Sequence, residues 1–142
     1  MSALRFRFLT PWYDRLVAWT VRDAEMKASL LMHAKVAPGE RVLDVGCGTG
    51  TLLLQLASHV REARLAGVDA DPEMLRQAEA KAAAAGIGMD LTPAWADALP
   101  FGDGAFDVVL SSLFFHHLQP PDKQQSLREI WRVLRPGGRV LI

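Results

Sequence analysis

Three glycines stand at alternate positions, Gly46, Gly48 and Gly50, within the stretch VLDVGCGTGTL that covers residues 42–52. Glycine lets a backbone turn sharply and lets a ligand approach main-chain atoms closely. Asp44 lies two residues before the first glycine, inside an apolar run. A glycine-rich loop that directly follows a segment with a carboxylate indicates a nucleotide-like ligand. The carboxylate favours a ligand that carries an ammonium group. A tight turn without any ligand is the alternative.

The glycine spacing separates this loop from two common phosphate-binding motifs. The dinucleotide fingerprint is G-x-G-x-x-G/A, whereas here Thr51 occupies the third site and Gly50 comes one place early. A carboxylate at Asp44 would also lie awkwardly near a pyrophosphate. Thr51 is not followed by lysine, so a P-loop does not fit. A nicotinamide-dependent oxidoreductase therefore remains only a less favoured alternative.

Two further carboxylates complete a pattern. Asp69 ends an apolar run, where it would accept hydrogen bonds from both hydroxyls of a ribose, and Asp97, in WADALPF, would accept one from an adenine amino group. Asp44 would help to orient the loop toward an ammonium. A ligand with an ammonium, a ribose and an adenine is S-adenosylmethionine. Asp44 as an acceptor for loop amides, and Asp97 as a turn residue, remain open alternatives.

The elements that position these residues alternate between helices and strands. Apolar periodicity and turn signals predict helices at 11–35, 51–60, 72–85 and 121–134, and strands at 41–45, 63–70, 88–97, 106–112 and 138–142. Asp71 is expected to cap the third helix, with Gly86 as its stop. The alternation predicts an α/β fold with three layers, in which a doubly wound, mostly parallel sheet has helices on both faces. Ligands of such folds bind at the carboxyl ends of the strands, where the glycine loop is expected.

Composition sets broad limits on function. The chain has 142 residues with 16 basic and 16 acidic side chains, which indicates one domain and argues against a nucleic-acid partner. The single cysteine favours a reducing compartment. Neither an apolar run of membrane-spanning length nor a secretory signal is evident, so we expect a cytoplasmic protein without stable membrane insertion.

Four segments in the right order resemble class I, Rossmann-like S-adenosylmethionine-dependent methyltransferases. They are VLDVGCGTG, GVDADPEML, ADALPFGDGAFDVVLSSLFFHHL and LREIWRVLRPGGRVLI, and the resemblance covers about residues 38–142. The likeness is greatest to the group that includes quinone-biosynthesis and other small-molecule methyltransferases. WYDRLV, near the start, resembles the N-terminal cap segment of that group, which implies that Tyr13 closes over the cofactor.

The resemblance implies roles for the loop and the second strand. Gly46, Gly48 and Gly50 would line the methionine half of the cofactor, with Cys47 among them, and Asp69 would hold the ribose. A nucleophilic role for Cys47 is disfavoured, because no base stands beside it in the sequence.

The later motifs imply contacts with the adenine and the acceptor. Ala70 and Met74 would lie beside the adenine, and Asp97 and Ala98 at its edge. Ser111 would lie near both the cofactor and the acceptor pocket.

The expected reaction is methyl transfer to a small-molecule acceptor by in-line displacement, in which the protein mainly positions donor and acceptor. His116 and His117 follow the fourth strand, and one of them could act as a general base for an oxygen acceptor. Packing within the loop is the alternative for both. No metal is expected, because the two histidines lack further ligands at suitable spacing. Asp107 is interpreted as structural, at the strand end away from the ligand.

The pattern departs from the family at its end, because the usual sheet has seven strands and this chain stops after the fifth. We therefore expect an N-terminal helical cap at 1–36 and a Rossmann-like core at 37–142 that lacks the last two strands. A truncated domain is favoured over a half completed by a partner, and a homodimer is possible. The rival function is a non-catalytic S-adenosylmethionine-binding subunit, and the sequence does not identify the methyl acceptor.

Overall fold

A parallel sheet forms the centre of the molecule. The structure is a computed structural model that describes residues 10–111 and 120–142, with side chains at 20–111 and 122–142. Within these residues, the strands pair in the order β3-β2-β1-β4-β5, every pair parallel. They are β1 (Arg41–Val45), β2 (Arg64–Asp69), β3 (Asp90–Pro93), β4 (Phe106–Leu110) and β5 (Leu134–Leu141). The predicted α/β fold is confirmed, and the strand order reverses beside β1.

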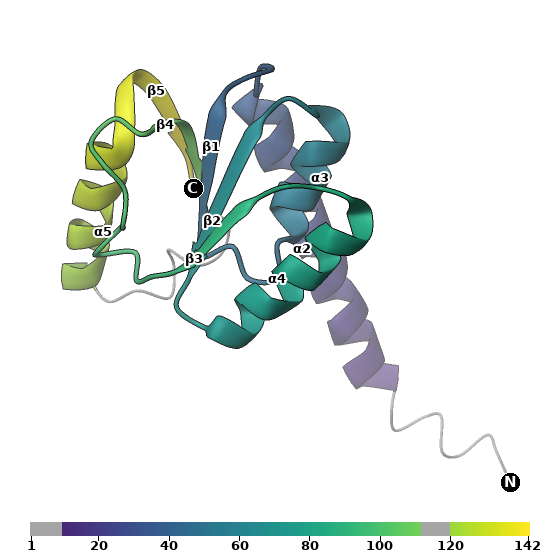
Figure 1. Ribbon diagram of the computed structural model, residues 1–142. Helices are drawn as coiled ribbons and strands as arrows, with labels where there is room; N and C mark the ends of the chain where they lie inside the picture. Colours follow the sequence, from purple (N-terminus) through teal and green to yellow (C-terminus); the bar gives the residue numbers. More distant parts are fainter. Residues whose placement is uncertain (1–9, 112–119) are drawn as a thin grey trace, which may run out of the picture.

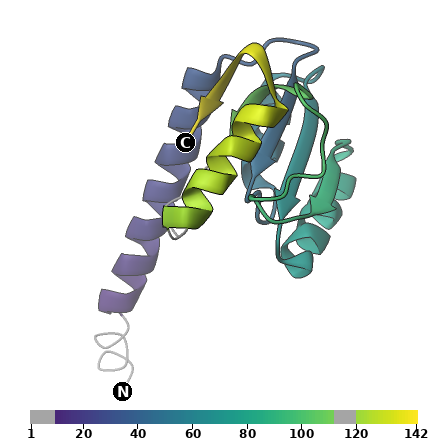
Figure 2. The ribbon, with the colours of Figure 1, turned by 90° about the vertical axis from the view of Figure 1, so that its left-hand side faces the viewer.

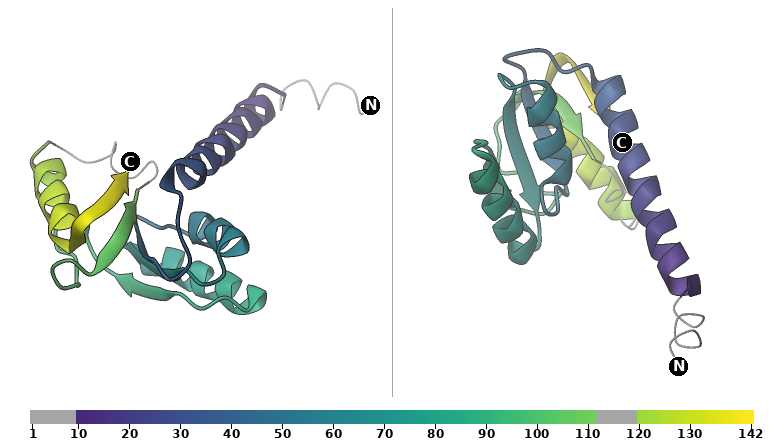
Figure 3. Two further views of the ribbon diagram at one scale, coloured as in Figure 1. Left: turned by 90° about the horizontal axis from the view of Figure 1, so that it is seen from above. Right: turned by 90° about the vertical axis from the view of Figure 1, so that its right-hand side faces the viewer.

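Helices cover both faces of the sheet. They are α2 (Thr10–Ala34), α3 (Thr51–His59), α4 (Pro72–Ala85) and α5 (Pro120–Val133). The right-hand view of Figure 3 has α3 and α4 in front of the strands, whereas Figure 2 faces α5. Figure 1 shows that the N-terminal part of α2 extends past the carboxyl ends of the strands, which is the edge where ligands of such folds bind.

Side chains alternate along β1 between two apolar cores. Val42 packs with Leu53 of α3 and Ala34 of α2, whereas Leu43 packs with Val133 of α5 on the opposite face. Successive residues of a strand point to opposite faces. Asp44 therefore projects to the face that α2 and α3 cover.

Local signals explain the helix ends. The Asp71 carboxylate accepts a hydrogen bond from the Glu73 amide at 2.9 Å, and Pro72 begins α4, as predicted. Gly86 ends that helix in the left-handed conformation, with φ of 68°. No helix in residues 10–111 and 120–142 combines the length and apolarity that a membrane crossing would require.

The expected start of the last strand is wrong. The segment Pro136-Gly137-Gly138 was expected to separate the last helix from a strand at 138–142, but β5 begins at Leu134, directly after α5. The segment forms an irregularity within β5. Phe106 of β4 pairs with Leu134, and the next pair along the strands joins Val108 to Arg139, so the residues between Leu134 and Arg139 have no regular partner in β4.

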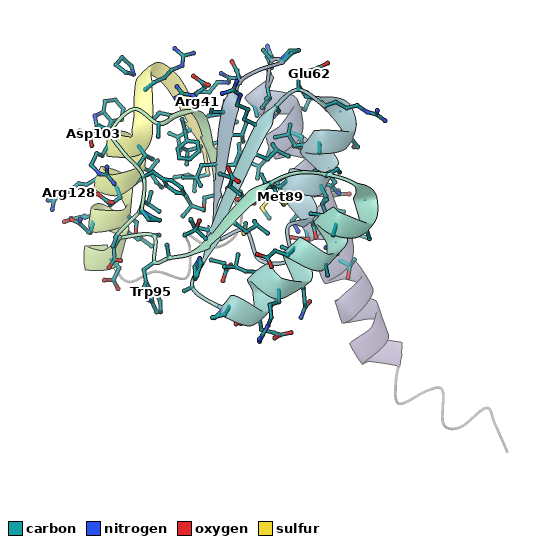
Figure 4. All side chains as sticks on the ribbon, viewed as in Figure 1. Arg41, Glu62, Met89, Trp95, Asp103 and Arg128 are labelled. Atoms are coloured by element: carbon teal, nitrogen blue, oxygen red, sulfur yellow. The ribbon has the colours of Figure 1, made fainter. Side chains whose placement is uncertain are left out.

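Two tryptophans lie on the surface of the molecule. Trp95 is 68% exposed and Trp131 is 78% exposed. Figure 4 shows Trp95 on the loop that follows β3, pointing away from the sheet.

Asp107 has the structural role that the sequence predicted. Its carboxylate accepts hydrogen bonds from the Arg41 amide at 2.7 Å and the Arg41 guanidinium at 3.3 Å, and it pairs with Arg135. Burial alone would raise the pKa of Asp107, but these two arginines outweigh it and hold the pKa below its usual value. The cluster fixes β1, β4 and β5 at the edge opposite the glycine loop.

Candidate functional site

The glycine loop connects β1 to α3 in a backbone form that favours glycine. Gly46, Gly48 and Gly50 have φ of 74°, 55° and 79°, in the left-handed region that side chains disfavour. The amides of Gly46 and Cys47 both donate to the Val68 carbonyl of β2, at 2.8 and 2.9 Å. The loop is thus tied to the neighbouring strand, and Gly50 begins α3 without a side-chain cap from the described residues.

Asp69 links the second strand to the loop. One carboxylate oxygen accepts from the Gly48 amide and the other from the Asp71 amide, each at 2.9 Å. Each carboxylate oxygen has a second lone pair, so both can still accept from a ligand hydroxyl. Asp69 is half-buried at the carboxyl edge, where a ribose could reach it.

Replacing Gly50 by alanine is expected to weaken ligand binding at least tenfold and to destabilise the fold by about 1–3 kcal/mol. A Cβ at Gly50 would lie 3.1 Å from the Ala78 Cβ, in a backbone with φ of 79°. Gly86→Ala is the matched control, because Gly86 has φ of 68° but open space around it. Urea unfolding and calorimetric titration should show destabilisation in both variants and lost binding only in Gly50→Ala. Equal binding by the two would remove the loop from the site.

Asp44 is buried at the centre of the sheet, and one of its carboxylate oxygens lacks a hydrogen-bond partner among the described residues. The residue is 1% exposed, and its Oδ1 finds no hydrogen-bond partner in the part of the chain that is described. Its strand neighbours are Gly67 and Leu110, which supply no polar side chain. Burial raises the pKa of Asp44 to about 8, with Lys27 lowering it and Asp69 raising it. The site thus holds a carboxyl group that a cationic ligand group would ionise.

Ser111 provides a second buried polar group at the same edge. It follows β4, is 1% exposed, and its Oγ has no partner among the described side chains and backbone.

Cys47 belongs to the glycine loop but is poorly suited to nucleophilic chemistry. Burial, aided by the charges of Asp44 and Asp69, raises the pKa of its thiol to about 12.

The loop after β3 is held in place by α5. The Leu99 amide donates to Glu129 at 2.8 Å, and Arg132 donates to the carbonyls of Leu99 and Phe101 at 3.0 and 2.7 Å. The hydrogen bond and charge of Arg132, with the Leu99 amide, outweigh desolvation and lower the pKa of Glu129. Asp97 lies on this loop, exposed, where its carboxylate is open to a ligand.

The structure brings most of the predicted positions to one edge of the sheet. The loop after β1, the end of β2, the turn at 95–98 and the end of β4 all lie there, because the strands are parallel. Ala70 and Met74 are half-buried, and Ala98 is exposed. His116 and His117 fall outside the described residues, as does the side chain of Tyr13.

Sequence reasoning missed three contributors to the site. Gly67 of β2 makes room for the loop, since a Cβ there would lie 2.8 Å from the Cys47 Sγ. The Glu129–Arg132 pair could have been suspected from its i, i+3 spacing, but not its contact with the loop. Lys27 was not singled out, although its charge acts on Asp44.

Comparison with known proteins matches this geometry to one family. The family model described as "Methyltransferase domain" matches residues 42–138, which include the glycine loop, Asp69 and the α5 segment. The chain belongs to the class I S-adenosylmethionine-dependent methyltransferases. The family assignment supports S-adenosylmethionine as the ligand that the loop and carboxylates accommodate, and it leaves the nicotinamide alternative without support.

Individual relatives agree with this assignment. Demethylmenaquinone methyltransferase of Thermus thermophilus is 36% identical over 140 residues, which cover 96% of this chain and 62% of that protein. Malonyl-[acyl-carrier protein] O-methyltransferase of Herminiimonas arsenicoxydans is 40% identical, over 98% of this chain and 49% of its own length. A methyltransferase of Aquifex aeolicus, described as SAM-dependent, aligns with a TM-score of 0.69 at 27% identity, covering 78% of this chain and 58% of that one. The chain spans about half to three-fifths of the length of these relatives.

The residues present fit S-adenosylmethionine. The orphaned Asp44 Oδ1 can accept from an ammonium, and the Asp69 carboxylate can accept from ribose hydroxyls. The open backbone at Gly48, where a Cβ would meet nothing within 4 Å, leaves room for close approach.

Proposed function

We propose that this methyltransferase domain binds S-adenosylmethionine at the carboxyl edge of β1, β2 and β4 and transfers its methyl group to a small-molecule acceptor. One observation carries the proposal. Two buried polar groups without partners among the described residues, Asp44 Oδ1 and Ser111 Oγ, stand at the ends of adjacent strands beside the glycine loop. Unpaired buried polar atoms are costly, so their presence at a ligand edge indicates that a ligand satisfies them.

S-adenosylmethionine held at this edge would supply an activated methyl group, and we propose that the chain orients it for in-line transfer to the acceptor. The chain's own part is to position and to exclude water. Asp44 takes the ammonium end, Gly48 and Gly50 allow close approach, and Asp69 holds the ribose. Correct orientation can lower such a barrier by about 7–11 kcal/mol, so no strong base is needed. His116 or His117 is proposed as a base only for an oxygen acceptor.

The remaining cofactor contacts are proposed from the same edge. Cys47 and Gly46 line the methionine half, Ala70 and Met74 flank the adenine, and Asp97 with Ala98 meets its edge. Tyr13 is proposed to close over the cofactor from α2.

A quinone-type acceptor is the first candidate to test. The relative from Thermus thermophilus is named for demethylmenaquinone and matches over a larger share of its length than the malonyl-carrier enzyme does. Incubation with S-adenosylmethionine and either a reduced demethylmenaquinone or a malonyl thioester should yield S-adenosylhomocysteine with the first. Turnover with the malonyl thioester alone would reassign the acceptor. Tight cofactor binding without turnover on either would favour the non-catalytic binding subunit.

The β5 edge is proposed as the place where a partner or a second copy adds to the sheet. Leu127 and Trp131 of α5 and Val140 of β5 line one hollow beside this edge and are exposed, at 43%, 78% and 39%. An apolar surface beside a strand edge is a ready template for strand pairing. The molar mass of the protein by light scattering tests for the second copy.

A further inference from the structure

The inward face of α2 carries a charged pair where apolar residues would be expected. From Thr20 to Ala34, the positions that are half-buried or buried recur at the helical spacing, at Asp23, Met26, Lys27, Leu30, Leu31 and Ala34. Residues with this spacing share one face of a helix. Leu30 and Leu31 pack against the core that contains Val42 and Leu110. Asp23 and Lys27 thus continue the stripe that faces the domain.

The pair is partly enclosed rather than solvated. Lys27 Nζ lies 2.8 Å from Asp23 Oδ2, and the two side chains are 17% and 24% exposed. Asp23 precedes Lys27 by four residues, the favourable order for such a pair on a helix. The contact holds the ammonium of Lys27 on the inward face and directs it toward the N-terminal end of α2.

Lys27 on α2 and Asp44 on β1 lie at a similar level when their positions are measured along the direction of the strands. Arg139 of β5 donates to the Ala34 and Lys35 carbonyls, which fixes the end of α2 near the Val42–Val108 level of the sheet. Lys27 lies about 10 Å back along the helix, at 1.5 Å per residue. Asp44 lies about 7 Å beyond Val42 along β1. Lys27 therefore stands at or just past Asp44, level with the glycine loop.

The direction of Asp44 places its carboxyl on the face of the sheet that α2 covers. Asp44 shares the sheet face of Val42, which is the face that α2 and α3 cover. The positive charge of Lys27 acts on Asp44 by lowering its pKa against the larger effect of burial. Even so, Asp44 Oδ1 accepts no hydrogen bond from Lys27 or from any other described group. The Asp44 carboxyl thus lies within the influence of the Lys27 charge while its Oδ1 stays unpaired among the described residues.

We propose that Lys27 binds the α-carboxylate of the methionine half of S-adenosylmethionine, while Asp44 faces its α-ammonium and Asp23 positions Lys27. The two protein charges would then match both charges of the amino-acid end. This inference rests on the proposed function. It adds a specificity determinant, because Lys27 would distinguish the cofactor from its decarboxylated form.

The test removes each partner of the contact separately. Binding of S-adenosylmethionine and of decarboxylated S-adenosylmethionine is measured by calorimetry on the wild type, Lys27→Met and Lys27→Arg. We expect the wild type to prefer S-adenosylmethionine by about tenfold or more, because a charge-assisted hydrogen bond is among the stronger kinds. Lys27→Met should lose that preference by weakening only S-adenosylmethionine, and Lys27→Arg should keep most of it. Lys35→Met, an equal loss of charge just beyond the end of the same helix, should bind both ligands as the wild type does.

The outcomes separate this inference from the function it rests on. A wild type that binds neither ligand would overturn the proposed function. A wild type that binds both equally would overturn the role of Lys27 without any variant, even if Lys27→Met failed to fold. Equal weakening of both ligands in a folded Lys27→Met, by circular dichroism, would show that Lys27 only supports the structure.

Discussion

Replacing Asp44 by asparagine is expected to stabilise the folded chain and to weaken S-adenosylmethionine binding about a hundredfold. Burial raises the pKa of Asp44 to about 8, against an ordinary value of 3.8. The unfolded chain therefore ionises this carboxyl at lower pH than the folded chain does, and the folded state loses stability as the pH rises from about 4 to about 8. Asparagine removes that loss while keeping nearly the same volume.

The size and pH dependence of the effect follow from the same shift. At pH 7 the loss amounts to at most about 4 kcal/mol, at about 1.4 kcal/mol per pH unit. The buried amide has its own cost of about 1–3 kcal/mol, so we expect a net gain of about 1–3 kcal/mol. Urea unfolding at pH 5, 7 and 8.5 should show the advantage of Asp44→Asn growing up to pH 8 and then levelling. Parallel stability curves would show that Asp44 ionises normally in the folded chain.

Binding provides a second readout of Asp44. Lys27 from α2, Asp69 from β2 and Cys47 of the loop are the titratable groups that interact with it, and Cys47 is neutral at pH 7 because its pKa is raised to about 12. A ligand ammonium would ionise Asp44, so binding at pH 7 should release close to one proton. Calorimetry in two buffers of different ionisation enthalpy measures this release. Asp44→Asn should abolish it, and release that persists in the variant would place the titrating group elsewhere.

Asp69→Ala is expected to weaken S-adenosylmethionine binding at least tenfold. The carboxylate accepts from the Gly48 and Asp71 amides, and it is proposed to accept from both ribose hydroxyls. Hydrogen bonds to a charged group contribute about 1.5–3 kcal/mol each, so losing even one of the two ribose contacts lowers the affinity about tenfold or more. Calorimetric titration at pH 7.5 measures the change.

Asp71→Ala is the matched control for Asp69. Its carboxylate also accepts from a backbone amide, that of Glu73, but it serves only to cap α4. Losing this cap should cost about 1 kcal/mol of stability and leave affinity within about threefold. The ribose assignment would fail if Asp69→Ala bound like the wild type, or if both variants lost affinity equally.

Local chemistry in the sequence predicted most of the fold and the position of the glycine loop in it. Asp71, Pro72 and Gly86 mark the ends of α4 because caps act over a few residues. The three glycines predicted the loop from their residue type alone, and in the structure each of them adopts the positive φ that glycine permits. Alternation of elements was enough to place the loop at the carboxyl edge of a parallel sheet.

Long-range geometry could not be predicted in the same way. The irregularity of β5 depends on how Arg139 pairs with Val108 across the sheet, which no local signal encodes. The inward direction of Lys27 depends on which face of α2 packs on the core. The unpaired state of Asp44 depends on Gly67 and Leu110 being its neighbours in adjacent strands. Each of these residues is distant in sequence from the group it acts on.

The most direct test of the central claim is a calorimetric titration of the wild-type chain with S-adenosylmethionine at pH 7.5, after circular dichroism has established that the chain is folded. The loop, Asp44 and Asp69 predict saturable binding of one equivalent, strongly reduced in Asp69→Ala. A folded chain that shows no saturable binding would contradict the assignment of this edge as a cofactor site.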